Sequence, residues 1–396
     1  MMHYCRSLGL TCLCLLSFDV QALTLSETPF DALHAEAKRV FVGEVVSVEV
    51  EPSPWRAGSA RRRIEVSVDR TLKGDVGKRA VFYLPGGLLE GIRTHVFGVP
   101  ELAMGDRSLF LLEARGDEWT PMAYARGVWP ESFASKVEPA GKGNIEPSPL
   151  EAGFLIMSTG TGKDVHWNNR CVEVWLQQDG SAAFDASALD EVLIESFERW
   201  TDAQDGVLRG VHRGYTCFDG VGISAWPGVQ NVIQFRDTPG SWTHSKKIAA
   251  LTTVMYREDT GELVDADVEF NQESEKFTVD GSVDSFSLRY TMTHEIGHLL
   301  GLDHSSINAS VMGVNSVPKH VGDFALHADD SNAIGAAYPP GEGEASCSNA
   351  SFHAPESSHC PAEPEPEGCS GTKSHPVHIV FAVLILLGLL PARRFV

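Results

Sequence analysis

The chain has 396 residues, of which 43% are hydrophobic and 21% are charged, so it can bury a sizeable core and is not disordered as a whole. At this length we expect two folded domains with accessory segments. Acidic residues outnumber basic ones by 53 to 32. The resulting net charge of −21 argues against a nucleic-acid partner, because binding to phosphates requires the opposite balance.

Residues 1–22 have the pattern of an export signal. Arg6 is an early positive charge, Leu8 to Phe18 is a short apolar run, and Val20-Gln21-Ala22 forms a small-x-small cleavage site. The run is too short to span a membrane, and a buried first strand or helix is the less favoured alternative. We therefore expect the folded part to be secreted or displayed at the cell surface, where disulfides persist.

A first domain, over residues 23–145, is predicted to be rich in β-strands. Val40 to Val50 and Arg63 to Asp69 contain alternating apolar and polar residues, and glycine-containing turns follow such runs. Short strands with such turns favour a small closed or nearly closed barrel, and the pattern resembles the OB-type barrels of netrin-like modules. This domain contains no catalytic group of residues. His34 and His95 are isolated, and we expect both to be surface or packing residues.

A second domain, over residues 146–342, is predicted to be of the α+β class, with a mixed sheet packed on helices. Leu189, Leu193, Phe197 and Trp200 recur at helical spacing and predict one amphipathic helix. The segments expected to form strands are Cys171–Leu176, Asn231–Arg236, Leu251–Tyr256 and Asp267–Phe270.

The most informative segment of the chain contains His294, Glu295 and His298. Two histidines four residues apart lie one turn apart on a helix, so both imidazoles can reach a single metal ion. Gly301 can end this helix with a positive φ and turn the chain back, so that His304 supplies a third nitrogen. Three neutral imidazoles leave one tetrahedral position open, which is typical of a catalytic zinc site. Glu295 is placed to act as a base on a water molecule without being a ligand.

This segment resembles the metzincin zinc peptidases and, within them, the matrixins. Ser305 directly follows the third histidine, as in matrixins. Met312 lies eight residues after His304, which is the matrixin spacing of a tight turn beneath the metal. The resemblance implies a twisted mixed sheet with helices, one catalytic Zn²⁺ bound by the three histidines, and peptide-bond hydrolysis with Glu295 as the base. Asp265–Phe270 resembles the acidic strand of that family, and Asp329-Asp330 resembles the start of its closing helix.

The sequence also departs from the animal matrixins. It lacks the histidine-containing run that binds their structural zinc, and it has no cysteine between residues 23 and 170 that could serve as their latency switch. Ca²⁺ is an open alternative at Asp265, Asp267 and Asn271, although turn or strand-edge roles are favoured. The substrate-pocket segment has His320 where the family has tyrosine, so the pocket's preference is not predicted.

The C-terminal end changes composition twice. Residues 343–374 are rich in Pro, Glu, Ser and Cys and are expected to be a disordered spacer, and residues 375–396 form a short hydrophobic segment that ends in basic residues. This end resembles the myxobacterial type of C-terminal sorting tail, in which a cysteine, here Cys369, precedes the apolar segment. A permanent single-span anchor is the alternative. Both imply outer-membrane or cell-surface association.

Five cysteines follow the predicted cleavage site. Cys171 and Cys217 lie in the same predicted domain and form a candidate disulfide, although sequence alone does not determine connectivity. Cys347, Cys360 and Cys369 lie towards the C-terminus. A sorting or lipidation role for Cys369 would account for the one cysteine left unpaired.

These observations predict a monomeric, secreted or surface-displayed zinc endopeptidase that acts on proteins or peptides and has no nucleic-acid partner. The alternative is a latent or non-hydrolytic zinc-containing surface binding protein that is regulated by its N-terminal barrel. All three predicted ligands and the glutamate are present, which favours the enzyme.

Overall fold

The computed structural model describes residues 24–25, 30–54, 58–134, 153–177, 180–203, 207–223, 231–280, 285–313 and 324–339, together with Cys347. The predicted export signal, the boundary near residue 145, Cys369 and the hydrophobic segment 375–396 lie outside these residues. So does the predicted spacer, apart from Cys347. Within the described ranges, no helix has the length and apolar character needed to cross a membrane.

The N-terminal part contains a six-stranded antiparallel sheet in the order β4-β3-β2-β7-β8, with β9 also paired to β7. The alternation predicted for residues 63–69 is confirmed in β3, where buried and more exposed side chains alternate from residue 60 to residue 67, whereas β2 has a buried run over residues 40–43 and becomes more exposed towards residue 50. The strands are β2 (Arg39–Pro52), β3 (Ala60–Lys73), β4 (Arg79–Pro85), β7 (Arg107–Arg115), β8 (Glu118–Pro121) and β9 (Val128–Pro130). Helix α1 (Phe30–Glu36) and the short 3₁₀ helices η1 (Tyr124–Gly127) and η2 (Glu131–Phe133) accompany them.

Of the two predicted forms, the fully closed barrel is not formed by the described strands. No strand pairing joins β4 to β8, so the sheet remains open. The reason lies in β5 (Gly87–Leu89) and β6 (Ile92–Val96), which follow β4 in the chain. They form an antiparallel hairpin that pairs with the other sheet of the protein instead of closing this one.

The second sheet has the order β11-β10-β12-β14-β13-β6-β5. Its first four strands are parallel, β13 is antiparallel to β14, and the mixed sheet predicted from sequence is thereby confirmed. The strands are β10 (Cys171–Gln177), β11 (Arg209–Thr216), β12 (Val232–Arg236), β13 (Ile248–Arg257) and β14 (Leu263–Asn271). A separate parallel pair consists of β15 (Phe277–Thr278) and β16 (Phe286–Ser287).

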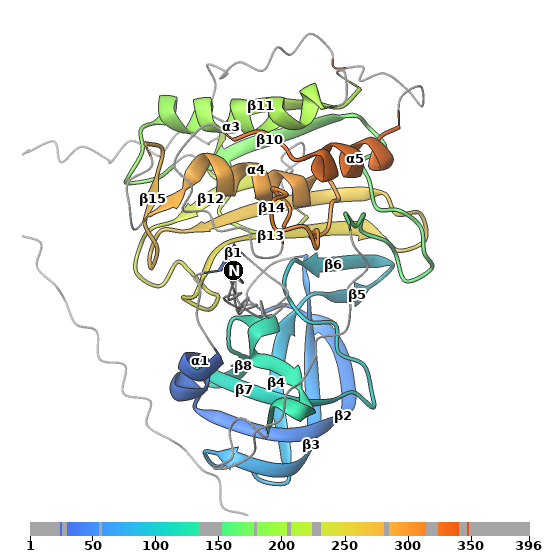
Figure 1. Ribbon diagram of the computed structural model, residues 1–396, viewed down its shortest axis with the longest axis vertical. Helices are drawn as coiled ribbons and strands as arrows, with labels where there is room; N and C mark the ends of the chain where they lie inside the picture. The colour runs from blue at the N-terminus through green and yellow to red at the C-terminus, as the bar shows by residue number, and fades with distance from the viewer. Residues whose placement is uncertain are drawn as a thin grey trace, which may run out of the picture. The chain divides into compact units, whose positions relative to one another are not determined.

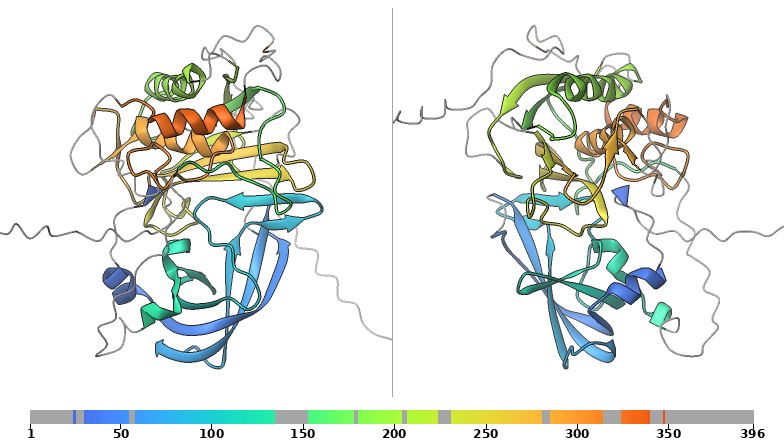
Figure 2. Two further views of the ribbon diagram at one scale, coloured as in Figure 1. Left: turned by 45° about the vertical axis from the view of Figure 1, so that its right-hand side comes forward. Right: turned by 90° about the vertical axis from the view of Figure 1, so that its left-hand side faces the viewer.

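Three helices accompany this sheet: α3 (Ala186–Asp202), α4 (Leu288–Leu299) and α5 (Ala328–Ala337). The predicted amphipathic helix is α3, whose leucine, phenylalanine and tryptophan side chains are buried. It begins after Asp185, whose carboxylate accepts a hydrogen bond from the amide of Ala188 (2.9 Å). Both views in Figure 2 show α3 and α4 on the same side of the sheet. The Trp200 indole of α3 joins them by donating to the carbonyl oxygen of Thr293 in α4 (2.9 Å).

The outer edge of β13 is covered by strands from the N-terminal part of the chain. Strand β6 pairs with residues 253–257, and β1 (Thr24–Leu25) pairs with residues 248–250 (Figure 1). Each of the two predicted domains also contributes side chains to the hydrophobic core of the other. Phe97 is buried in the core of the second domain, whereas Trp242 and Ile248 are buried in a core built mainly by the first. The described parts of the two predicted domains are therefore interlocked rather than independent.

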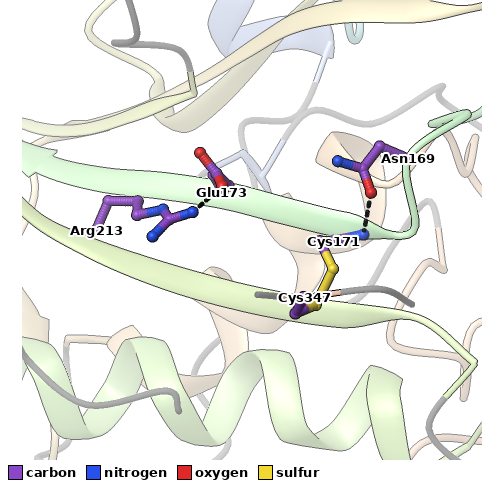
Figure 3. Close-up of a disulfide and its surroundings, with 5 residues drawn as sticks. All are labelled: Asn169, Cys171, Glu173, Arg213 and Cys347. Atoms are coloured by element: carbon purple, nitrogen blue, oxygen red, sulfur yellow. Dashed lines mark hydrogen bonds and ion pairs between the residues drawn. A yellow bond between two sulfur atoms is a disulfide. The ribbon is translucent and has the colours of Figure 1, made fainter. Parts of the chain in front are cut away.

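The disulfide of β10 differs from the predicted one. Cys171 is bonded to Cys347, with their Cα atoms 5.5 Å apart, and not to Cys217 (Figure 3). Cys217 is also disulfide-bonded. The prediction was wrong because the pairing depends on tertiary proximity. The chain beyond α5 brings Cys347 back to the start of β10, across a sequence separation of 176 residues.

Candidate catalytic metal centre

Helix α4 positions the first two histidines of the predicted site. It begins after Ser287, whose hydroxyl oxygen accepts a hydrogen bond from the Tyr290 amide (3.3 Å), and nearly every residue of the helix is buried. As predicted, the chain turns at Gly301 with a φ of 90°. A Cβ atom at this position would collide with the carbonyl oxygen of Val165, so glycine is required for the close approach as well as for the backbone conformation. The turn brings His304 back to the helix.

The three predicted ligands converge. One nitrogen from each of His294, His298 and His304 lies within 4.8 Å of the others, and this is the one histidine, cysteine or carboxylate cluster of metal-binding geometry in the described part of the chain. The Nδ1 atom of His294 lies 2.6 Å from the carbonyl oxygen of Val311, and that of His298 lies 2.8 Å from the carbonyl oxygen of Leu302. A carbonyl only accepts, so each Nδ1 carries the proton. Each Nε2 therefore presents a lone pair to the centre.

The protonation states suit a metal site. Burial lowers the pKa of His298 and His304 well below the usual value of 6.5, and the neighbouring histidines lower both further. These two imidazoles are therefore neutral at neutral pH. A neutral imidazole is the form that binds a metal ion.

Two observations on the ligand nitrogens fit a zinc ion. The Nε2 atom of His294 is buried and has no hydrogen-bond partner, which is costly unless another group satisfies it. The Nε2 atoms of His298 and His304 lie 3.2 Å apart. Nitrogens bound tetrahedrally to one zinc at ~2.0–2.1 Å lie about 3.4 Å apart, close to this separation. A cation between the three rings would give the buried Nε2 atom of His294 a partner.

Glu295 is held from the neighbouring strand. Its side chain is only 2% exposed, and its Oε2 atom accepts a hydrogen bond from the hydroxyl of Thr252 in β13 (2.6 Å). Thr252 could not be predicted as a site residue, because the sequence around it gives no sign of its contact with Glu295, 43 positions away. This contact fixes the orientation of the carboxylate beside the histidines.

The turn that contains Met312 lies beneath the histidines, as predicted. Met312 is 1% exposed and packs against Gly297, which lies between His294 and His298 on α4. The turn is held by Asp330, whose carboxylate accepts hydrogen bonds from the amides of Val311 (2.9 Å) and Met312 (3.1 Å). The motif at residues 329–330 was noticed in the sequence, but this role in supporting the turn was not.

The acidic residues of β14 have structural partners. Asp267 accepts hydrogen bonds from the amides of Gly222 (2.7 Å) and Val232 (2.8 Å), and Asn271 donates to the carbonyl oxygen of Ile248 (2.8 Å). Because β14 is paired on both sides, these contacts indicate buried structural roles inside the sheet rather than the strand-edge roles that were favoured from sequence, and they give no support to Ca²⁺. The predicted pocket segment at residues 317–320 lies outside the described residues.

Comparison with known proteins agrees with this geometry. Residues 240–339 match the sequence profile of the matrixin family. Over this segment the chain is similar to the matrixin metallopeptidases. The chain is also similar to matrilysin of Rattus norvegicus, with 38% identity over 58 residues, which are 15% of this chain and 22% of the relative. The chain thus matches about a fifth of the length of that relative. The matrixin-like segment includes β13, β14, α4 and α5, so all three histidines, Glu295 and Met312 lie within the match.

Proposed function

We propose that this protein is an exported, zinc-dependent endopeptidase that hydrolyses peptide bonds within proteins. One observation carries the proposal. Three buried imidazoles converge through their Nε2 atoms, one of which has no partner, beside the carboxylate of Glu295. Together with the matrixin match, this donor set favours a catalytic zinc ion held by His294, His298 and His304.

The chemistry that such an ion supplies is Lewis-acid activation of a water molecule and of the peptide carbonyl. Glu295 takes the proton from the water as attack begins and passes it to the leaving amine. The Thr252 hydroxyl keeps the carboxylate oriented for both transfers. The carbonyl oxygens of Val311 and Leu302 keep the protons of two ligand imidazoles on Nδ1, so that their Nε2 atoms remain available.

The proposed substrates are polypeptides in an extended conformation, because the edge of β13 beside Glu295 would be suited to pairing with one once β1 and β6 leave it. Location outside the cytoplasm is supported by the export-signal pattern and by the Cys171–Cys347 disulfide, which would persist only in an oxidising compartment. We also propose that the protein is a monomer and associates with the cell surface through its C-terminal tail. A latent form of the same enzyme is favoured by a separate observation, which is the burial of the three histidines.

The proposal is tested by purifying the chain from an oxidising compartment, counting zinc per chain and measuring the cleavage of gelatin. Glu295→Gln is the matched variant, since it keeps the shape of the side chain but removes the base. We expect one zinc in both proteins and a loss of turnover of about a thousandfold in the variant. A folded protein without zinc would contradict the proposal. Equal turnover in the two zinc-loaded proteins would refute the role of Glu295.

A further inference from the structure

The catalytic edge of β13 is occupied by the protein itself. An unpaired strand edge offers amide and carbonyl groups to which an extended peptide can add. Here β6 pairs antiparallel with β13 over residues 253–257, and β1 pairs with residues 248–250. Between them the amide of Phe97 donates to the carbonyl oxygen of Thr252 (3.2 Å), the residue whose side chain binds Glu295. An incoming peptide would have to displace these contacts.

The residue after β6 also covers the metal site. The ring of Phe97 stacks on the imidazole of His298, with ring centroids 3.8 Å apart and planes 19° apart, and its edge faces His304 at 6.5 Å. Phe97 is 1% exposed. His95, which the sequence suggested to be a surface or packing residue, packs edge-on against Phe97 at 4.8 Å. Two rings from the N-terminal part of the chain therefore lie beside the ligands.

The consequence is that the candidate reaction centre is closed. His298 is 1% exposed, His304 is 9% exposed, and Glu295 is buried as well. A peptide bond must come within hydrogen-bond reach of Glu295 to be hydrolysed. That approach requires side chains to move away from the ligands, and the Phe97 ring stacked on His298 is one of them.

We propose that the hairpin β5–β6 with Phe97 is a built-in inhibitor, which keeps the peptidase latent by filling the strand edge and capping the zinc ligand His298. The inference rests on the proposed function and adds its regulation. It also supplies a latency device in a chain that has no cysteine between residues 23 and 170.

The hairpin and a neighbouring N-terminal segment are each tied to the second domain by a polar contact. Arg93 forms an ion pair with Glu258 (2.7 Å) just beyond β13, and both side chains are largely buried. Outside the hairpin, the Tyr124 hydroxyl of η1 bonds to His244 Nδ1 (2.7 Å) and ties another N-terminal segment to the chain that precedes β13. The interlocked cores bury further apolar surface around these two contacts. Release of the hairpin therefore has to overcome these contacts together with the stacking of Phe97 on His298, so loss of the Phe97 ring makes release easier.

The test measures access to the metal directly, without relying on turnover. A fluorescent peptide hydroxamate, which binds an accessible zinc ion, is titrated into the full-length, zinc-loaded protein. Phe97→Ala opens the cap. Leu88→Ala is the matched control, because Leu88 lies on the same hairpin but is 38% exposed. The pair Ile92→Cys and Arg257→Cys places cysteines at opposed positions of β6 and β13, where a disulfide would lock the hairpin in place.

We expect Phe97→Ala to bind the hydroxamate about ten- to a hundredfold more tightly than the wild type, because the buried stacking contact no longer competes. Gelatin cleavage should rise in parallel, and Leu88→Ala should behave as wild type. The oxidised cysteine pair should bind at least about tenfold more weakly than the same protein after reduction, with wild type treated identically as the reference.

The outcomes separate this inference from the proposed function. Equal hydroxamate affinity in wild type, Phe97→Ala and the locked pair would overturn the inhibitor, while gelatin cleavage by all of them would leave the endopeptidase standing. If Phe97→Ala bound the hydroxamate more tightly but cleaved no gelatin, the result would support the capping role of Phe97 and contradict the proposed endopeptidase activity. If Phe97→Ala does not fold, the locked pair alone decides, because oxidation and reduction compare one protein with itself.

Discussion

Gly297 and Met312 are in direct contact beneath the two helical ligands. A Cβ atom at position 297 would overlap the Met312 sulfur and would approach Trp200 Cζ2 to 2.9 Å. The glycine between His294 and His298 therefore lets the turn at residues 310–313 pack against the helix that carries the ligands. The position of Val311, whose carbonyl oxygen accepts from His294, depends on the same contact.

Gly297→Ala should for this reason destabilise the protein by about 1 to 3 kcal/mol through overpacking and weaken zinc binding. Thermal unfolding and zinc titration would measure the two effects. Met312→Ala in the same chain should relieve part of the overlap, so the double variant should lose less than the sum of the single ones. If the losses of stability in the two single variants were fully additive in the double variant, the contact between residues 297 and 312 would not be the cause of the destabilisation.

Thr252→Val should lower kcat by about tenfold while leaving zinc content unchanged, because the hydroxyl that orients Glu295 is lost without a change of shape. Thr252→Ser retains the hydroxyl and is the control. Zinc analysis and peptide hydrolysis of the three proteins provide the measurement. A serine variant as impaired as the valine variant would indicate that packing, and not the hydrogen bond, is responsible.

A pH dependence is expected from the acidic residues of β14. Burial raises the pKa of Asp265 to about 6, and burial together with the charge of Asp265 raises that of Asp267 well above its usual value. Folding therefore favours the protonated forms. The stability contributed by this pair is fully present below pH ~4 and is lost as the pH rises through about 6.

Asp265→Asn should accordingly raise the free energy of unfolding by about 2 kcal/mol at pH 7.5 and have little effect at pH 4. Urea unfolding of the metal-free protein at the two pH values measures this. Asp259→Asn, in the exposed turn that follows β13, is the control for the change in net charge. A gain of equal size at both pH values would rule out relief of the buried charge as the cause.

Cys347→Ser should destabilise the protein by about 2 to 5 kcal/mol, because the disulfide closes a loop with a sequence separation of 176 residues. Cys171→Ser should cost a similar amount, and the double variant should cost little more than either one. Denaturant unfolding under oxidising conditions would compare them. If the double variant lost as much stability as the two single variants together, the result would contradict the pairing of Cys171 with Cys347.

The sequence by itself determined the features that depend on local periodicity. The four-residue spacing of His294 and His298 fixes their common face on any helix, and Gly301 can adopt the conformation that returns the chain towards them. The spacing of Leu189, Leu193, Phe197 and Trp200 determines the buried face of α3 in the same way. These properties need no information about distant parts of the chain.

Only the tertiary structure decided which distant segments meet. The pairing of Cys171 with Cys347, the contact of Thr252 with Glu295 and the addition of β6 to β13 join residues between 43 and 176 positions apart. The alternation that predicts a strand does not specify its partner, because any exposed strand edge offers the same amide and carbonyl groups. For that reason the sequence did not predict that β6 lies against β13 and brings Phe97 onto His298.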